Sequence, residues 1–153
     1  MNYEAVSHLA TAAAVVCASY QILLSRQQAQ TSFEDSLAKE YRDLASRMPT
    51  KAFLGESLTD VEYKEAEDEF YHYFDLCNSQ AFLRQIKRVR SKTWKFWCDG
   101  IRSNLNRPAF SKAWQTISSQ ANGDFAELRM LIEQDYTIDP GSRSWRQLLK
   151  VKS

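Results

Sequence analysis

The sequence predicts an all-α fold, in which an N-terminal transmembrane helix continues into a small cytoplasmic helical bundle. Three observations lead to this prediction. Residues 5–25 contain no Asp, Glu, Lys or Arg. Apolar residues beyond them recur every three or four positions, which is the spacing of one helix face. No segment alternates apolar and polar residues for long enough to indicate a strand, and with only 4 Gly and 3 Pro the chain lacks the turn residues of a sandwich or barrel.

Residues 1–25 form the predicted membrane anchor. Their uncharged part, AVSHLATAAAVVCASYQILLS, is close to the ~20 residues that cross a hydrocarbon core, and only a helix satisfies the backbone groups there. Ala10, Ala14 and Ala18 repeat every fourth position and give a stripe of small residues along which neighbouring helices can approach closely. A buried core helix is the alternative, because Ala, Ser and Thr dilute the apolarity of the stretch.

The charges that flank this stretch predict its orientation. Glu4 precedes it and Arg26 follows it, and an excess of positive charge marks the cytoplasmic side of a span. We therefore expect the rest of the chain to face the cytoplasm. The sequence has no basic segment before the apolar stretch, which argues against a cleaved signal peptide.

Residues 26–48 predict an amphipathic continuation of the same helix. An apolar stripe with spacings of four, four, three and four runs along it, formed by Phe33, Leu37, Tyr41, Leu44 and Met48. Since no Gly or Pro occurs before Pro49, we expect one continuous rod that joins the span to the domain. The cytoplasmic helical domain is then predicted over residues 49–153.

Two helices are expected in the first half of this domain. Thr59 and Glu62 form a capping box for a helix that we expect to end near Val89. Ser91 is the expected N-cap of the next helix, which carries an apolar stripe of Trp94, Trp97, Cys98, Ile101 and Leu105.

The second half is marked by turn and start signals. Pro108 is expected at the first position of a further helix, where proline is favoured. Asn122-Gly123-Asp124 and Asp139-Pro140-Gly141 indicate turns. The domain is thus predicted to be a helical bundle with large aromatic residues in its core.

Charge separates along the chain, although the net charge is only +1. Residues 56–75 hold eight acidic residues against Lys64, and residues 84–107 hold eight basic residues against Asp99. The basic residues are densest at the break between two helices, where the free N–H groups of a helix start favour anions. The predicted ligand-binding residues are Arg84, Lys87, Arg88, Arg90, Lys92 and Trp94, with Trp94 stacking on the base of an anionic nucleotide.

A simpler interpretation of the basic loop stays open. Its cations would pair with the acidic helix or touch anionic lipid head groups. Because the net charge is close to zero, duplex nucleic acid is not an expected partner.

The sequence predicts a binding protein rather than an enzyme. His8 and His72 are the only histidines, and Cys17, Cys77 and Cys98 form no CxxC pair. A metal site or a nucleophile–histidine pair therefore has few residues to draw on. We expect no catalytic residues, no metal and no cofactor.

The stretch YFDLCNSQAFLRQIKRVRSKTWKFWCDGIRSNLNRPAFSKAW resembles uncharacterised bacterial single-pass membrane-anchored helical proteins. That group has one N-terminal hydrophobic helix, an amphipathic continuation and a similar TWxxWxxGI core. The resemblance implies the fold and a single-pass topology in the bacterial inner membrane, and no activity.

In overall plan the chain is also similar to a small membrane effector of type III CRISPR defence that binds cyclic tetra-adenylate. This similarity implies a homo-oligomer, for which a tetramer is one possible arrangement. A ligand with four phosphates suits a fourfold axis lined by Arg and Lys. It implies a membrane-anchored effector that binds an anionic nucleotide second messenger and perturbs the bilayer in antiviral defence. The alternative function is a constitutive membrane-tethered scaffold that binds lipid head groups or a partner protein.

Overall fold

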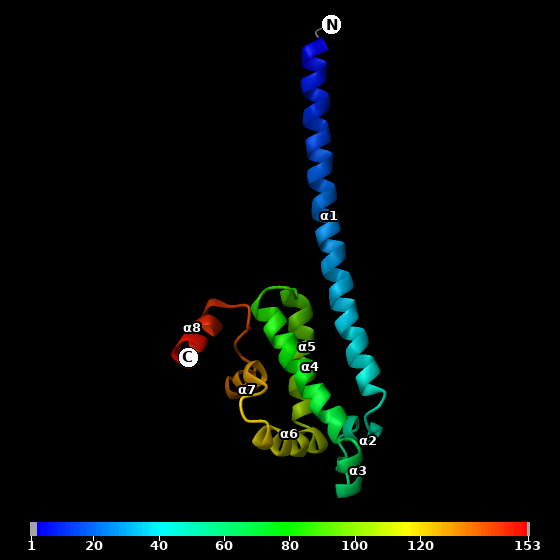
Figure 1. Ribbon diagram of the computed structural model, residues 1–153, viewed down its shortest axis with the longest axis vertical. Coiled ribbons are helices and arrows are strands. Elements are labelled where there is room, and N and C mark those ends of the chain that lie inside the picture. Colours follow the sequence, from blue (N-terminus) through cyan, green and yellow to red (C-terminus); the bar gives the residue numbers. More distant parts are fainter. Residues whose placement is uncertain (1–2, 153) are drawn as a thin grey trace. The chain divides into compact units, whose positions relative to one another are not determined.

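The structure is a computed structural model that describes residues 3–152, with side chains described for residues 3, 8 and 11–147. All regular elements in these residues are helices (Figure 1), which confirms the all-α prediction. The helices are α1 (Tyr3–Ala45), α2 (Thr50–Phe53), α3 (Asp60–Glu65), α4 (Glu67–Gln85), α5 (Ser91–Leu105), α6 (Pro108–Gln120), α7 (Ala126–Glu133) and α8 (Arg143–Lys152).

Helix α1 is unbroken, as predicted, but it ends at Ala45 rather than at Met48. A turn follows it, in which the N–H of Arg47 donates to the carbonyl of Leu44 over 3.0 Å. The chain divides into two compact units, one up to Leu37 and one from Ala38 onward. The boundary between these two units falls inside α1.

Among the described residues, no helix combines the length and the apolarity that a membrane crossing requires. The predicted span includes residues 5–7, 9 and 10, whose side chains lie outside the described ones. The transmembrane part of the predicted fold thus stays a prediction.

Within the second unit, α4 is the central helix and contacts α5, α6 and α7. Its buried side chains belong to an aromatic core in which Phe110 of α6 is completely buried. The ring centroid of Phe110 lies 5.2 Å from Phe53, 5.3 Å from Phe70 and 5.0 Å from Tyr73. These edge-to-face contacts join α2, α4 and α6, and aromatic pairs at such distances are favourable beyond the area that they bury.

The predicted helix from Thr59 towards Val89 is in fact two helices. The capping box is present, since Thr59 accepts from the Glu62 N–H and the Glu62 carboxylate accepts from the Thr59 N–H. Helix α3 ends at Glu65, with Ala66 as its C-cap, and α4 runs from Glu67 only to Gln85. The next helix begins after Arg90, which is the N-cap in place of the predicted Ser91.

Helix α7 is positioned by side chains from its neighbours. Phe125, its N-cap, has φ 59° and provides no side-chain cap. Asn78 of α4 supplies the cap instead, because its Oδ1 accepts from the N–H groups of Glu127 at 3.0 Å and Leu128 at 3.1 Å. A helix start that lacks its own cap is thereby tied to the central helix.

The predicted start of α6 at Pro108 and the predicted turns at 122–124 and 139–141 are present. In the second of these turns, Oδ1 of Asp139 accepts from the N–H of Gly141 over 2.8 Å. The turn leads into α8, whose Trp145 is completely buried and donates from Nε1 to Oε1 of Gln85 over 3.0 Å. The C-terminal helix is thus anchored on the end of α4.

Candidate functional site

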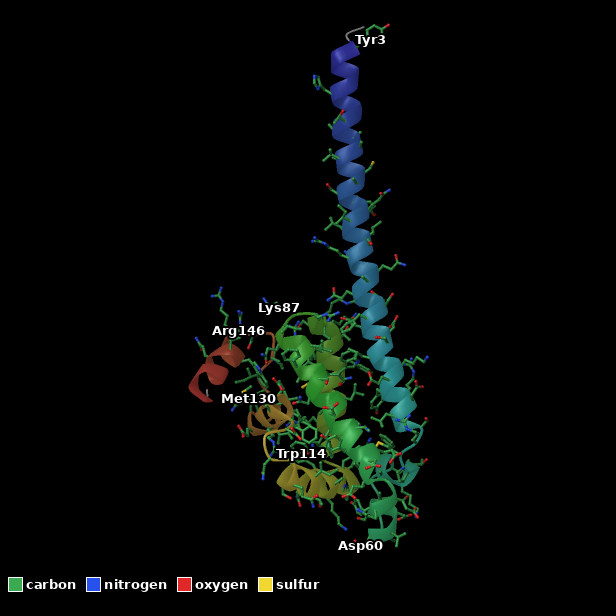
Figure 2. All side chains as sticks on the ribbon, viewed as in Figure 1. Tyr3, Asp60, Lys87, Trp114, Met130 and Arg146 are labelled. Atoms are coloured by element: carbon green, nitrogen blue, oxygen red, sulfur yellow. The ribbon has the colours of Figure 1, made fainter. Side chains whose placement is uncertain are left out.

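The basic loop between α4 and α5 has a well-defined backbone. Helix α4 closes with the N–H of Arg88 donating to the carbonyl of Leu83 and the N–H of Lys87 donating to that of Arg84, both over 2.9 Å. This is the Schellman arrangement, and Lys87 occupies its left-handed position with φ 62°. Glycine is the usual residue there, so a lysine places its side chain at the end of the helical hairpin at some cost in backbone energy (Figure 2).

Arg84 holds this loop in place and is not directed at an external ligand. Its Nε and Nη2 donate to the two carboxylate oxygens of Asp139 over 2.8 Å and 2.7 Å, and its Nη1 donates to the carbonyl of Val89 over 2.9 Å. A methyl group added at Gly141 would lie 2.9 Å from the guanidinium carbon, so the turn is packed directly on Arg84. Three of the five N–H donors of Arg84 are therefore paired inside the protein, and its predicted ligand-binding role stays a prediction.

Trp94 does not lie on the surface. Its side chain is 3% exposed and belongs to the buried stripe of α5. A ligand base needs access to a ring face, so this burial gives no support to the stacking role predicted for Trp94, which stays a prediction.

The other four predicted residues form an exposed group, which we call the loop cations: Lys87, Arg88, Arg90 and Lys92. They lie on the connection from the end of α4 to the start of α5, which is fixed by the buried Val89 and by the hydrogen bond from Arg84 to the Val89 carbonyl. The acidic stretch at α3 and the start of α4 has ion pairs with Lys51, Lys64 and Lys112. The structure thus brings four of the six predicted residues together on one connection.

A pocket of about 580 Å³ lies within the second unit, between the last turns of α1, the middle of α4 and the middle of α5. The sequence analysis did not predict it. Its walls include Tyr41 of α1, the buried Tyr73 and Cys77 of α4, and Phe96 and Trp97 of α5. Its volume is in the range of small-molecule sites, which are mostly apolar with a few placed polar groups.

Two buried amides line this pocket, and they differ in their hydrogen bonds. Asn104 has a partner for each group of its amide: its Nδ2 donates to the Tyr73 hydroxyl over 2.9 Å, and its Oδ1 accepts from Nη1 of Arg107. Gln80 is 5% exposed, and among the described residues no hydrogen bond partner of its amide is found. No sealed-off side-chain N or O atom lacks a partner in the described part of the chain, so the Gln80 amide must reach the open space of the pocket.

Gly100 lines the same pocket from the middle of α5. A Cβ placed there would meet no atom within 4 Å. Glycine inside a helix costs roughly 0.5–1 kcal/mol relative to alanine, and no close packing at this position requires it. Lys92 is exposed on α5 one helical turn before Phe96 at the pocket, which connects the pocket wall to the loop cations.

The thiols near the pocket are not activated. Burial raises the pKa of Cys77 to about 12 and the pKa of Cys98 to about 11, so both are protonated at neutral pH and are poor nucleophiles. Among the described side chains, no group of three His, Cys, Asp or Glu residues could hold a metal ion.

Comparison of the chain with models of known protein families, with curated proteins and with solved structures gives no match.

Proposed function

We propose that this chain is a membrane-anchored, homo-oligomeric effector whose helical domain binds an anionic nucleotide at the loop cations. In this proposal residues 5–25 insert into the bacterial inner membrane, the domain lies in the cytoplasm, and the chain is not an enzyme. Ligand binding would shift the packing of the subunits, and the unbroken α1 would transmit the shift to the membrane in antiviral defence. Cyclic tetra-adenylate is the ligand that the similarity to CRISPR effectors implies.

The observation that supports the nucleotide site is the placement of four exposed cations on one connection whose backbone is fixed from inside. Phosphate groups are bound by Arg and Lys side chains that converge from a rigid element. Val89 and Arg84 provide this rigidity, because Val89 is completely buried and its carbonyl accepts from Arg84.

The observation that supports the anchor is an exposed apolar segment on α1. Six large apolar side chains are 45–67% exposed: Val15, Val16, Tyr20, Ile22, Leu23 and Leu24. Exposed apolar side chains gathered on one stretch of a helix favour an apolar environment, which lipid or the same helix of other subunits would provide.

A second candidate function is a constitutive scaffold whose loop cations bind anionic lipid head groups or a partner protein. The burial of Trp94 and the internal pairing of Arg84 favour it, because they remove the base-stacking group and one cation from the predicted nucleotide site. The remaining cations would attract an anionic membrane surface by about 1 kcal/mol each.

Replacing Val16 and Leu23 with aspartate should release the full-length chain from membranes. Each buried charge near the centre of a span costs about 2.5–3.5 kcal/mol, so we expect the protein to move from the carbonate-washed pellet to the supernatant after ultracentrifugation. The control variant carries Val16→Leu and Leu23→Ile and should stay in the pellet. Recovery of the unmodified full-length chain in the supernatant would contradict the anchor.

Reversing the charge of Arg88 and Arg90 to glutamate should abolish saturable binding of cyclic tetra-adenylate to the full-length protein in nanodiscs of zwitterionic lipid. The loss of two charge-assisted contacts should raise the Kd at least about 100-fold, measured by isothermal titration calorimetry. Reversal of Lys39 and Arg47, which changes the net charge equally outside the loop, is the control. Equal binding of any polyanion, or binding to anionic vesicles alone, would favour the scaffold.

A further inference from the structure

We propose that the pocket between α1, α4 and α5 binds a planar heteroaromatic ring of purine size, whose edge pairs with the side-chain amide of Gln80. This inference rests on the proposed function only in one respect, namely that the ring would be the base of the nucleotide bound at the loop cations. The pocket itself is made of residues that the loop site does not include.

Two features of the pocket leave room and hydrogen-bonding groups for a ligand. The amide of Gln80 is buried with no hydrogen bond partner among the described residues, whereas the neighbouring amide of Asn104 has both of its groups paired. Gly100 leaves open space at the wall, in the middle of a helix. The Gln80 amide reaches the open space of the pocket, and this volume of about 580 Å³ leaves room for a ligand group that pairs with it.

The chemistry of the walls indicates the class of ligand. Gln80 offers a donor and an acceptor side by side, which match an acceptor and a donor on adjacent atoms of a ring, as on adenine. The aromatic side chains Phe96 and Trp97 line the same space, and Phe96 is 78% exposed. Aromatic side chains stack on flat π systems, whereas an aliphatic chain in the pocket would leave the amide unpaired.

The position of Lys92 connects the pocket with the phosphate site. Lys92 precedes Phe96 by four residues on α5, so the two side chains share one helix face. A ring in the pocket would therefore have a cation one turn away for a phosphate attached to it.

Adenosine is the probe for this pocket, because it carries the ring without a phosphate. Full-length protein in zwitterionic nanodiscs should bind it saturably, with one molecule per chain by equilibrium dialysis, and its Tm should rise with adenosine concentration. Gln80→Leu should weaken binding at least tenfold, while its Tm without ligand should equal or exceed that of the wild type. Gly100→Leu should also weaken binding by filling the pocket, and Gln115→Leu, which changes an exposed glutamine on α6, should have no effect.

Each outcome bears on one site. The absence of saturable adenosine binding up to millimolar concentration, or wild-type binding by Gln80→Leu, would overturn the pocket. The double variant Arg88→Glu with Arg90→Glu should bind adenosine normally. If that variant loses nucleotide binding while the wild type fails to bind adenosine, the loop site stands and the pocket is rejected. If the variant keeps nucleotide binding while the wild type binds adenosine, only the loop site is rejected.

Discussion

Replacing Phe110 with alanine should lower the free energy of unfolding of the helical domain by about 3–5 kcal/mol. Phe110 is completely buried and contacts aromatic rings of α2 and α4. Its removal leaves a cavity at the point where three helices meet, and the edge-to-face contacts are lost together with the buried area. Urea denaturation followed by tryptophan fluorescence would measure the change.

Phe96→Ala is the matched control for this prediction. Phe96 is also a phenylalanine on a helix, but its side chain is 78% exposed, so we expect a change within about 0.5 kcal/mol. A loss of less than about 1.5 kcal/mol for Phe110→Ala would show that the aromatic core is packed differently.

Replacing Arg84 with methionine should cost about 2–3 kcal/mol. Methionine keeps the apolar part of the side chain but removes the paired hydrogen bonds to Asp139 and the bond to the Val89 carbonyl. The loss of one partner leaves a partly buried carboxylate uncompensated, and this is the main energetic penalty when such a pair is broken. Lys87→Met, a change of the same kind at an exposed residue of the loop, should change stability by no more than about 0.5 kcal/mol.

The contribution of this pair should also depend on pH in a defined direction. Burial alone would raise the pKa of Asp139, but the hydrogen bonds from Arg84 and from the Gly141 N–H outweigh it and lower the pKa below its ordinary value of 3.8. A carboxylate with a lowered pKa stabilises the fold above the unfolded-state pKa and loses that effect as pH falls through the folded-state value. The difference in stability between wild type and Arg84→Met should therefore be constant near neutral pH and shrink in acid below pH 3.8; a difference unchanged at pH 2 would contradict the ion pair.

The spacing of apolar residues on α5 predicted the helix and its buried face, and the same spacing could have predicted the position of Trp94. Trp94 begins the stripe that continues through Cys98, Ile101 and Leu105, all of which are buried. The prediction that Trp94 stacks on a ligand relied on its nearness in sequence to the basic residues. Helical periodicity was the stronger signal, because it fixes the direction of each side chain.

A similar signal existed on α4. Tyr73, Cys77, Gln80 and Arg84 follow at spacings of four, three and four, so two polar residues lie on a face that is otherwise buried. A polar residue at a core position requires a partner. The partner of Arg84 is Asp139, which is far away in sequence, whereas the Gln80 amide faces the open pocket. The sequence alone could therefore mark both positions as unusual, but it could not identify the environment of either side chain.

Other features depend on contacts that no local pattern contains. The N-terminus of α7 is capped by Asn78 across a gap of about fifty residues, whereas its own N-cap, Phe125, is a poor capping residue. The pocket likewise needs α1, α4 and α5 in the same place. Sequence periodicity gives the helices and their faces, but the pairing of these faces is a tertiary property.

The open space beside Gly100 has a consequence for the evolution of this protein in the laboratory. A library of random variants that is selected only for heat resistance should enrich alanine at this position, since the change gains roughly 0.5–1 kcal/mol and meets no neighbouring atom. If the residue is instead retained when cells depend on the protein's activity, the contrast between the two selections would separate the demands of folding from those of biological fitness.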